Sequence, residues 1–140
     1  MGAKQEAAVM EMLDAWGGGK RAPDVDKIVA AFAPDGYWSL YMPDGPVIRG
    51  REALRTEIQR QMGYVQLPEC NTLKIVSSDD TVMTERVDYF TKSGIRVKHV
   101  LTAVFDMDSD NLITGWREYF DTLDLANQTK IDPNKLSGLE

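Results

Sequence analysis

Apolar residues recur every three or four positions in three segments of the first 63 residues. This spacing gathers them on one face of a helix, as with Leu54, Ile58 and Met62 in the third segment. The second segment begins after Asp24, a residue type that favours helix N-caps. Glycine follows the first and third segments, and Pro-Asp-Gly follows the second. The predicted helices span residues 4–16, 25–32 and 51–62.

Strand patterns dominate the rest of the chain. An aromatic run at 37–41 and a short run ending at Arg49 are separated by Pro-Asp-Gly-Pro, which predicts a hairpin. After Gly63 helical periodicity disappears, and β-rich runs alternate with turn-forming residues. This pattern is typical of long antiparallel strands joined by tight turns. The four runs cover residues 67–76, 81–91, 96–107 and 112–123.

This order of elements predicts an α+β fold, with three N-terminal helices packed on a curved sheet that can enclose a pocket. We expect residues 1–140 to form one domain, because 140 residues suit one hydrophobic core. The tail, residues 125–140, is broken by Pro133. We expect this tail to cover the pocket or to pack at an interface.

Composition and charge exclude several classes of partner. The chain has 16 Lys and Arg against 22 Asp and Glu, a net charge of −6, and no basic stripe, so nucleic acid is not expected as a partner. No apolar run approaches the roughly 20 residues that a bilayer requires, so a membrane is not expected either. The first 16 residues alternate charged and apolar positions, unlike a signal peptide, and we therefore expect a cytoplasmic protein.

The chain has one cysteine, Cys70, and one histidine, His99. A lone cysteine excludes an internal disulfide and a cysteine-based zinc site, and a lone histidine excludes a two-histidine metal site. We therefore expect no metal ion. Both residues are typical of packed strand positions.

Charged residues on two of the predicted strands are the candidates for chemistry. Alternation places Arg86 and Asp88 on one face of their strand, and it places Glu118 between Trp116 and Phe120 on another. If both faces line a poorly hydrated pocket, the arginine bridges two carboxyl groups whose pKa values are driven apart, which suits acid/base catalysis. A surface ladder of cross-strand ion pairs is the alternative.

The Arg-Val-Asp at 86–88 and the Trp-Arg-Glu-Tyr-Phe-Asp at 116–121 resemble the limonene-1,2-epoxide hydrolase family, as does the Gly-Arg-Glu-Ala at 50–53. The resemblance covers most of the chain in the order of its elements. It implies the cystatin-like, cone-shaped α+β fold of the superfamily named for nuclear transport factor two. In that fold a strongly curved mixed sheet encloses a pocket that serves many chemistries.

The resemblance also implies roles for the charged residues. Asp88 matches the acid that protonates the epoxide oxygen, and Arg86 matches the bridging arginine. Glu118 stands where the family has an aspartate that accepts the proton of the attacking water, so the carboxylate is kept but lies one methylene further out. Asp121 has the opposite parity and is expected to be a structural residue at the strand end.

The family holds its water with a Tyr-x-Asn pair just before a Met-Pro-like turn. Anchoring on the Met-Pro at 42–43 gives Ser39 and Tyr41 at these places, whereas an alignment that starts at Tyr37 gives Tyr37 and Ser39. Neither pair is identical to the family's, although each offers hydroxyl groups. The residues expected to line the pocket are Trp116, Phe120, Phe90 and Met62.

The function implied by the resemblance is cofactor-independent hydrolysis of a small apolar epoxide to a diol in one acid/base step. One alternative is an isomerase, dehydratase or cyclase that acts on a steroid-like or polyketide-like substrate. Another is a non-catalytic ligand-binding dimer whose buried charges only fix the fold. A homodimer is expected in each case.

Overall fold

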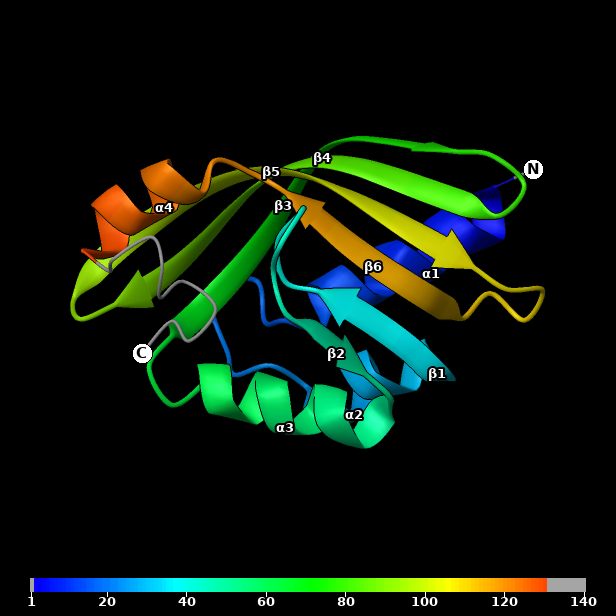
Figure 1. Cartoon of the computed structure of the whole chain (residues 1–140), viewed down its shortest axis with the longest axis horizontal. Coiled ribbons are helices and arrows are strands. Elements are labelled where there is room, and N and C mark those ends of the chain that lie inside the picture. The colour runs from blue at the N-terminus through cyan, green and yellow to red at the C-terminus, as the bar shows by residue number, and fades with distance from the viewer. Residues whose placement is uncertain (1, 131–140) are drawn as a thin grey trace.

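The computed structural model of the chain describes residues 2–130. One mixed sheet of six strands, in the order β2-β1-β6-β5-β4-β3, curves through the molecule (Figure 1). β1 runs parallel to β6, and every other neighbouring pair is antiparallel. The strands are β1 (Phe32–Ser39), β2 (Val47–Arg49), β3 (Gln66–Ser77), β4 (Thr81–Lys92), β5 (Ile95–Met107) and β6 (Ile113–Tyr119).

Four helices accompany the sheet: α1 (Ala3–Asp14), α2 (Val25–Ala30), α3 (Arg51–Gln61) and α4 (Thr122–Thr129). α1 packs against β3 and β4, whereas α2 and α3 pack against each other and against β1. The prediction of an α+β fold with a curved mixed sheet is confirmed. The helices do not form one N-terminal layer as expected, because β1 and β2 separate α2 from α3 and α4 follows the last strand.

The hairpin of β1 and β2 is confirmed, but β1 begins five residues earlier than the run predicted at 37–41. Phe32, expected at the end of a helix, instead pairs with Ile113 of β6. An irregularity between Phe32 and Tyr37 carries the strand past the Pro-Asp-Gly sequence. Gly36 suits this stretch, because a Cβ there would lie 2.6 Å from the carbonyl oxygen of Ile113.

The last predicted strand, 112–123, is too long. β6 ends at Tyr119, and Asp121 caps α4 by accepting hydrogen bonds from the backbone N–H groups of Leu123 and Asp124. α4 packs on β5 with Leu125 buried. Residues 125–130 of the predicted tail therefore belong to this helix and its C-cap, and the remainder of the tail lies outside the described residues.

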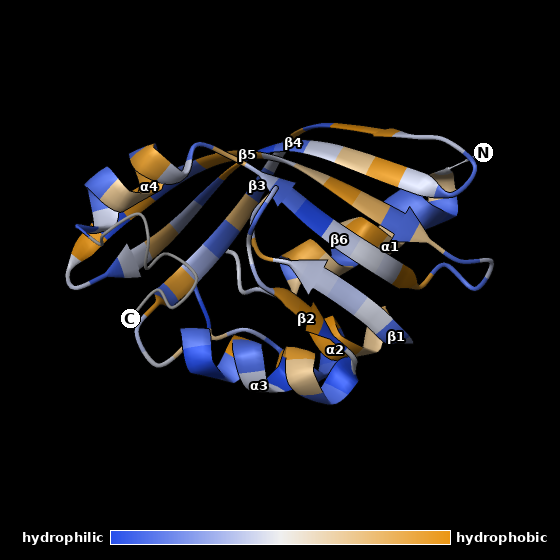
Figure 2. Cartoon of the chain, in the orientation of Figure 1, coloured by the Kyte–Doolittle hydropathy of each residue, from blue (hydrophilic) through white to orange (hydrophobic). Residues whose placement is uncertain are grey.

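The hydrophobic core joins α1 to the sheet. Val9, Met12 and Trp16 of the first amphipathic segment are buried together with Phe105 and Trp116 of the sheet. Hydrophobic and hydrophilic positions alternate around α3, as expected for a helix with one buried face (Figure 2). No helix within residues 2–130 has the length and apolar character needed to cross a bilayer.

Candidate active site

A cavity of about 120 Å³ lies over the concave face of the sheet and is lined mainly by apolar and aromatic side chains. All four residues predicted to line a pocket contribute to its wall. Leu125 of α4 also contributes, so part of the predicted tail does border the cavity. The four predicted residues are Met62, Phe90, Trp116 and Phe120.

The strand pattern brings the charged residues to this cavity. Every second residue of this part of β4 points to the concave face, namely Thr84, Arg86 and Asp88. Glu118 lies on β6, and β5 runs between β4 and β6. Ala103 of β5 is in register with both Thr84 and Glu118. Because alanine is small, the arginine side chain can extend over β5 and reach the glutamate.

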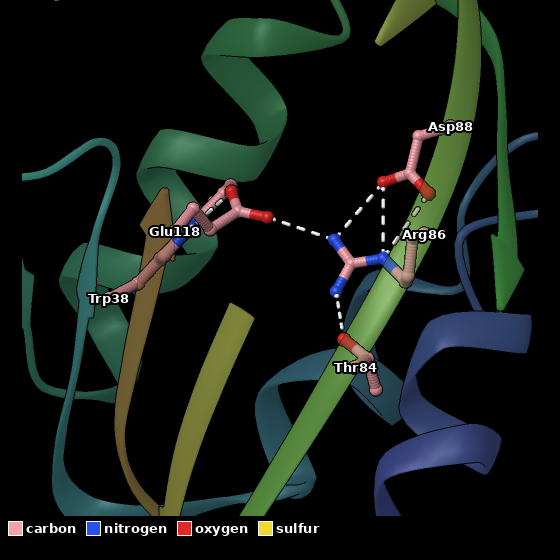
Figure 3. Close-up of polar contacts among 5 residues, drawn as sticks. All are labelled: Trp38, Thr84, Arg86, Asp88 and Glu118. Carbon is pink, nitrogen blue, oxygen red and sulfur yellow. Dashed lines mark hydrogen bonds and ion pairs between the residues drawn. The ribbon is translucent and has the colours of Figure 1, made fainter. Parts of the chain in front are cut away.

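Arg86 joins the two carboxyl groups (Figure 3). Its Nη2 donates to Glu118 Oε2 at 2.9 Å and to Asp88 Oδ2 at 3.1 Å, and its Nε donates to Asp88 Oδ1 at 3.2 Å. Its Nη1 donates to the hydroxyl of Thr84 at 2.9 Å. The side chain of Arg86 is only 1% exposed, so this is a buried charge cluster and not a surface ladder of ion pairs.

Glu118 has a second donor, because Nε1 of Trp38 lies 3.2 Å from its Oε1 (Figure 3). Trp38 stacks on Trp116 with ring centroids 4.7 Å apart, so the position of this donor is fixed. Sequence reasoning missed both Trp38 and Thr84. Thr84 has the same parity as Arg86 on its strand, so alternation could have indicated its role. The contact of Trp38 with Glu118 could not be predicted in this way, because it depends on the parallel pairing of β1 with β6.

Burial changes the protonation of this cluster. It raises the pKa of Glu118 to about 7 and also raises the pKa of Asp88, while the Arg86 guanidinium opposes both effects. Two ionised carboxylates would give the buried cluster a net negative charge, and a single proton makes it neutral. Near neutral pH the cluster can therefore offer one carboxylic acid and one carboxylate in the same cavity.

Cys70 of β3 and His99 of β5 are in register with Asp88, one on each side, and both line the cavity. Burial raises the pKa of the Cys70 thiol well above its usual range. Burial and the nearby Arg86 lower the pKa of His99 to about 4. The site therefore contains a thiol and a neutral imidazole that the sequence had indicated only as packed residues.

The structure separates the three residues proposed to hold water. Tyr41 lines the cavity, but Tyr37 and Ser39 do not. The hydroxyl of Tyr37 accepts a hydrogen bond from Arg117 at 2.8 Å, and the hydroxyl of Ser39 donates to the sulfur of Met42. Since Trp38 points to the cavity, its neighbours on β1 point away, and Tyr41 is the one of the three that lines the cavity.

Among residues 2–130, no three His, Cys, Asp or Glu side chains are grouped in a way that could hold a metal ion. The two carboxyl groups of the cluster, Asp88 and Glu118, are joined through Arg86. What this arrangement can do directly is move protons, with one carboxyl group on each side of the guanidinium.

Comparisons with known proteins show the family to which the chain is similar. The family model of the limonene-1,2-epoxide hydrolase catalytic domain matches residues 8–131. Epoxide hydrolase EphG of Mycobacterium tuberculosis is 36% identical over 78 residues, which are 56% of this chain and 51% of that protein. The match thus spans about half the length of this relative.

Solved structures show the same similarity over more of the chain. A limonene-1,2-epoxide hydrolase-like (LEH-like) epoxide hydrolase from M. tuberculosis superposes on this chain with a TM-score of 0.76 and 28% identity. The match covers 95% of this chain and 94% of the other. A putative polyketide cyclase from Xanthomonas campestris gives a TM-score of 0.77 at 21% identity, covering 90% and 96%, and shares the fold. Since the family model matches most of the sequence, the chain belongs to the limonene-1,2-epoxide hydrolase catalytic domain family.

Proposed function

We propose that this protein hydrolyses a small apolar epoxide to a diol by acid/base catalysis. The observation that carries the proposal is the bridge of Arg86, whose Nη2 contacts Glu118 at 2.9 Å and Asp88 at 3.1 Å in a mainly apolar cavity. Opening an epoxide requires a proton for the leaving oxygen and a base for the attacking water. The cluster holds both groups on the same side of the cavity.

The productive form of the cluster carries its single proton on Asp88, whereas burial favours the proton on Glu118, so only a fraction of the protein is in this form near pH 7. In the proposed step, Asp88 gives this proton to the epoxide oxygen as the C–O bond of the ring breaks. Water attacks the same carbon, and Glu118 takes one proton from this water, so that both oxygens end as hydroxyl groups. Arg86 keeps the two carboxyl groups in place. Glu118 then holds a proton and Asp88 is ionised, and the proton must return to Asp88 before the next cycle.

Two features support Glu118 as the base. Both of its oxygens accept hydrogen bonds, from Arg86 and from Trp38, and these bonds favour its ionised form. Its pKa of about 7 makes this carboxylate a stronger base than an ordinary glutamate. Tyr41, which lines the same cavity, is proposed to hold the attacking water with its hydroxyl.

Azide rescue separates the two roles. Glu118→Gln and Asp88→Asn should each lower kcat for cyclohexene oxide by at least about 100-fold, the usual scale for loss of an acid or base. Azide is already an anion and needs no base. It should therefore restore ring opening in Glu118→Gln, with an azido alcohol as product, and should fail in Asp88→Asn.

Glu85→Gln is the matched control, because Glu85 is exposed and lies next to Arg86 on β4 with the opposite parity. This variant should retain wild-type turnover. Wild-type turnover by either cavity variant would contradict the proposal. Rescue of Asp88→Asn alone would reverse the two roles.

A further inference from the structure

His99 is a cavity residue to which the proposed reaction assigns no role. It lies on β5 directly opposite Asp88 and is half-buried. Its ring contacts Phe120 edge to face, with centroids 4.4 Å apart, and it lies 6.4 Å from the ring of Phe90. These aromatic neighbours hold the imidazole in place by packing and not by hydrogen bonds.

The charged and amide side chains that line the cavity have partners within the protein, whereas the buried Nε1 atoms of Trp16 and Trp116 have none in the described part of the chain. Glu69 accepts hydrogen bonds from Asn71 and Arg96, Gln61 donates to Glu57, and the charged cluster is bridged internally. Within residues 2–130, neither ring nitrogen of His99 has a hydrogen-bond partner. An unpaired polar group in a mainly apolar cavity is costly unless water or a ligand satisfies it.

The protonation state of His99 determines what it can bind. Because its pKa is lowered to about 4, the imidazole is neutral near pH 7. A neutral imidazole offers one N–H donor and one nitrogen acceptor, which suits a hydroxyl or carbonyl oxygen better than an anion.

We propose that His99 is a substrate-binding residue that selects epoxides bearing a hydroxyl or carbonyl oxygen close to the ring. This inference rests on the proposed function, because that proposal places the epoxide beside Asp88. Residues directly opposite in an antiparallel pair have Cβ atoms about 5 Å apart. The second oxygen of the substrate therefore lies about three bonds from the epoxide, and the rest of the molecule is apolar.

Two nearly isosteric epoxides test the selection. Both are derivatives of cyclohexene oxide, one with a hydroxymethyl group and the other with an ethyl group on the carbon next to the epoxide. One hydrogen bond contributes about 1 kcal/mol, so the wild type should favour the hydroxymethyl compound by roughly fivefold or more in kcat/KM. His99→Leu should abolish this preference by slowing the hydroxymethyl compound alone.

His99→Gln retains a donor and an acceptor and should restore part of the preference. Val100→Leu, at the exposed position next to His99 on β5, is the control and should leave the preference unchanged. An unchanged preference in a folded His99→Leu variant would overturn the inference. Equal slowing of both compounds would also overturn it, because that result indicates a merely structural role.

A binding measurement keeps this inference separate from the proposed hydrolysis. His99 is the sole histidine, so selective ¹⁵N-histidine labelling of the wild type gives unambiguous ring-nitrogen resonances. Cyclohexylmethanol, which cannot react, should shift these resonances. A shift without turnover of any epoxide would reject the hydrolysis and support binding by His99, whereas turnover without a shift would reject the role of His99.

Discussion

Glu118→Gln tests the protonation state on which the acid/base account depends, through the pH dependence of stability. Burial raises the pKa of Glu118 from 4.5 to about 7. Between these two values the folded protein keeps a proton that the unfolded chain has lost. The free energy of unfolding therefore falls as pH rises through this window, and the loss is complete above pH 7.

The magnitude follows from the two pKa values. Their separation corresponds to about 3 kcal/mol of stability lost between pH 4.5 and pH 7. An amide at position 118 cannot ionise, so Glu118→Gln removes this loss. Asp88 would then keep Arg86 to itself, which favours the Asp88 carboxylate and does not recreate the loss.

Urea denaturation, followed by tryptophan fluorescence at about pH 5 and about pH 8, measures the effect. Relative to the wild type, Glu118→Gln should gain at least about 2 kcal/mol between the two conditions. Glu85→Gln removes an exposed carboxyl group of the same type and should follow the wild type. Parallel pH dependences for wild type and Glu118→Gln would refute a raised pKa at Glu118 and the reasoning built on it.

Three further substitutions and one control, Tyr37→Phe, probe the geometry of the site. Trp38→Phe keeps an aromatic ring but loses the N–H donor to Glu118, so more Glu118 is protonated at neutral pH and the rise of the kcat/KM profile should move to higher pH. Ala103→Leu should block the path of the arginine over β5, lower kcat at least about 100-fold and cost about 1–3 kcal/mol in urea denaturation. Tyr41→Phe should lower kcat about tenfold if its hydroxyl holds the water, whereas Tyr37→Phe should stay within about twofold of the wild type.

The faces of the functional strands could be predicted from the sequence because side chains alternate with a period of two. That rule places Arg86 with Asp88, and Glu118 with Trp116, and the structure has all four at the cavity. Alternation also indicates that Asp121 faces away. Its position at the end of the strand is explained by its role as the N-cap of α4, which sequence reasoning did not recognise.

Register between strands could not be predicted in this way. Cys70 and His99 flank Asp88 only because of how β3 and β5 pair with β4, and the β3–β4 pairing contains two irregularities. The direction in which the Tyr37 side chain points depends similarly on the register shift between Phe32 and Tyr37 near the start of β1. Single-strand patterns therefore find residues that face a cavity, but they do not find the partners that neighbouring strands bring to them.

A single turnover in water enriched in heavy oxygen tests the central claim most directly. If Glu118 activates water for direct attack, the diol should carry one heavy oxygen and the protein should carry none. A nucleophilic carboxylate would instead form an ester and later release one of its own oxygens into the diol, leaving heavy oxygen in the protein. Mass spectrometry of the diol and of the peptides containing Asp88 and Glu118 distinguishes the two routes, and heavy oxygen in either peptide would contradict the account.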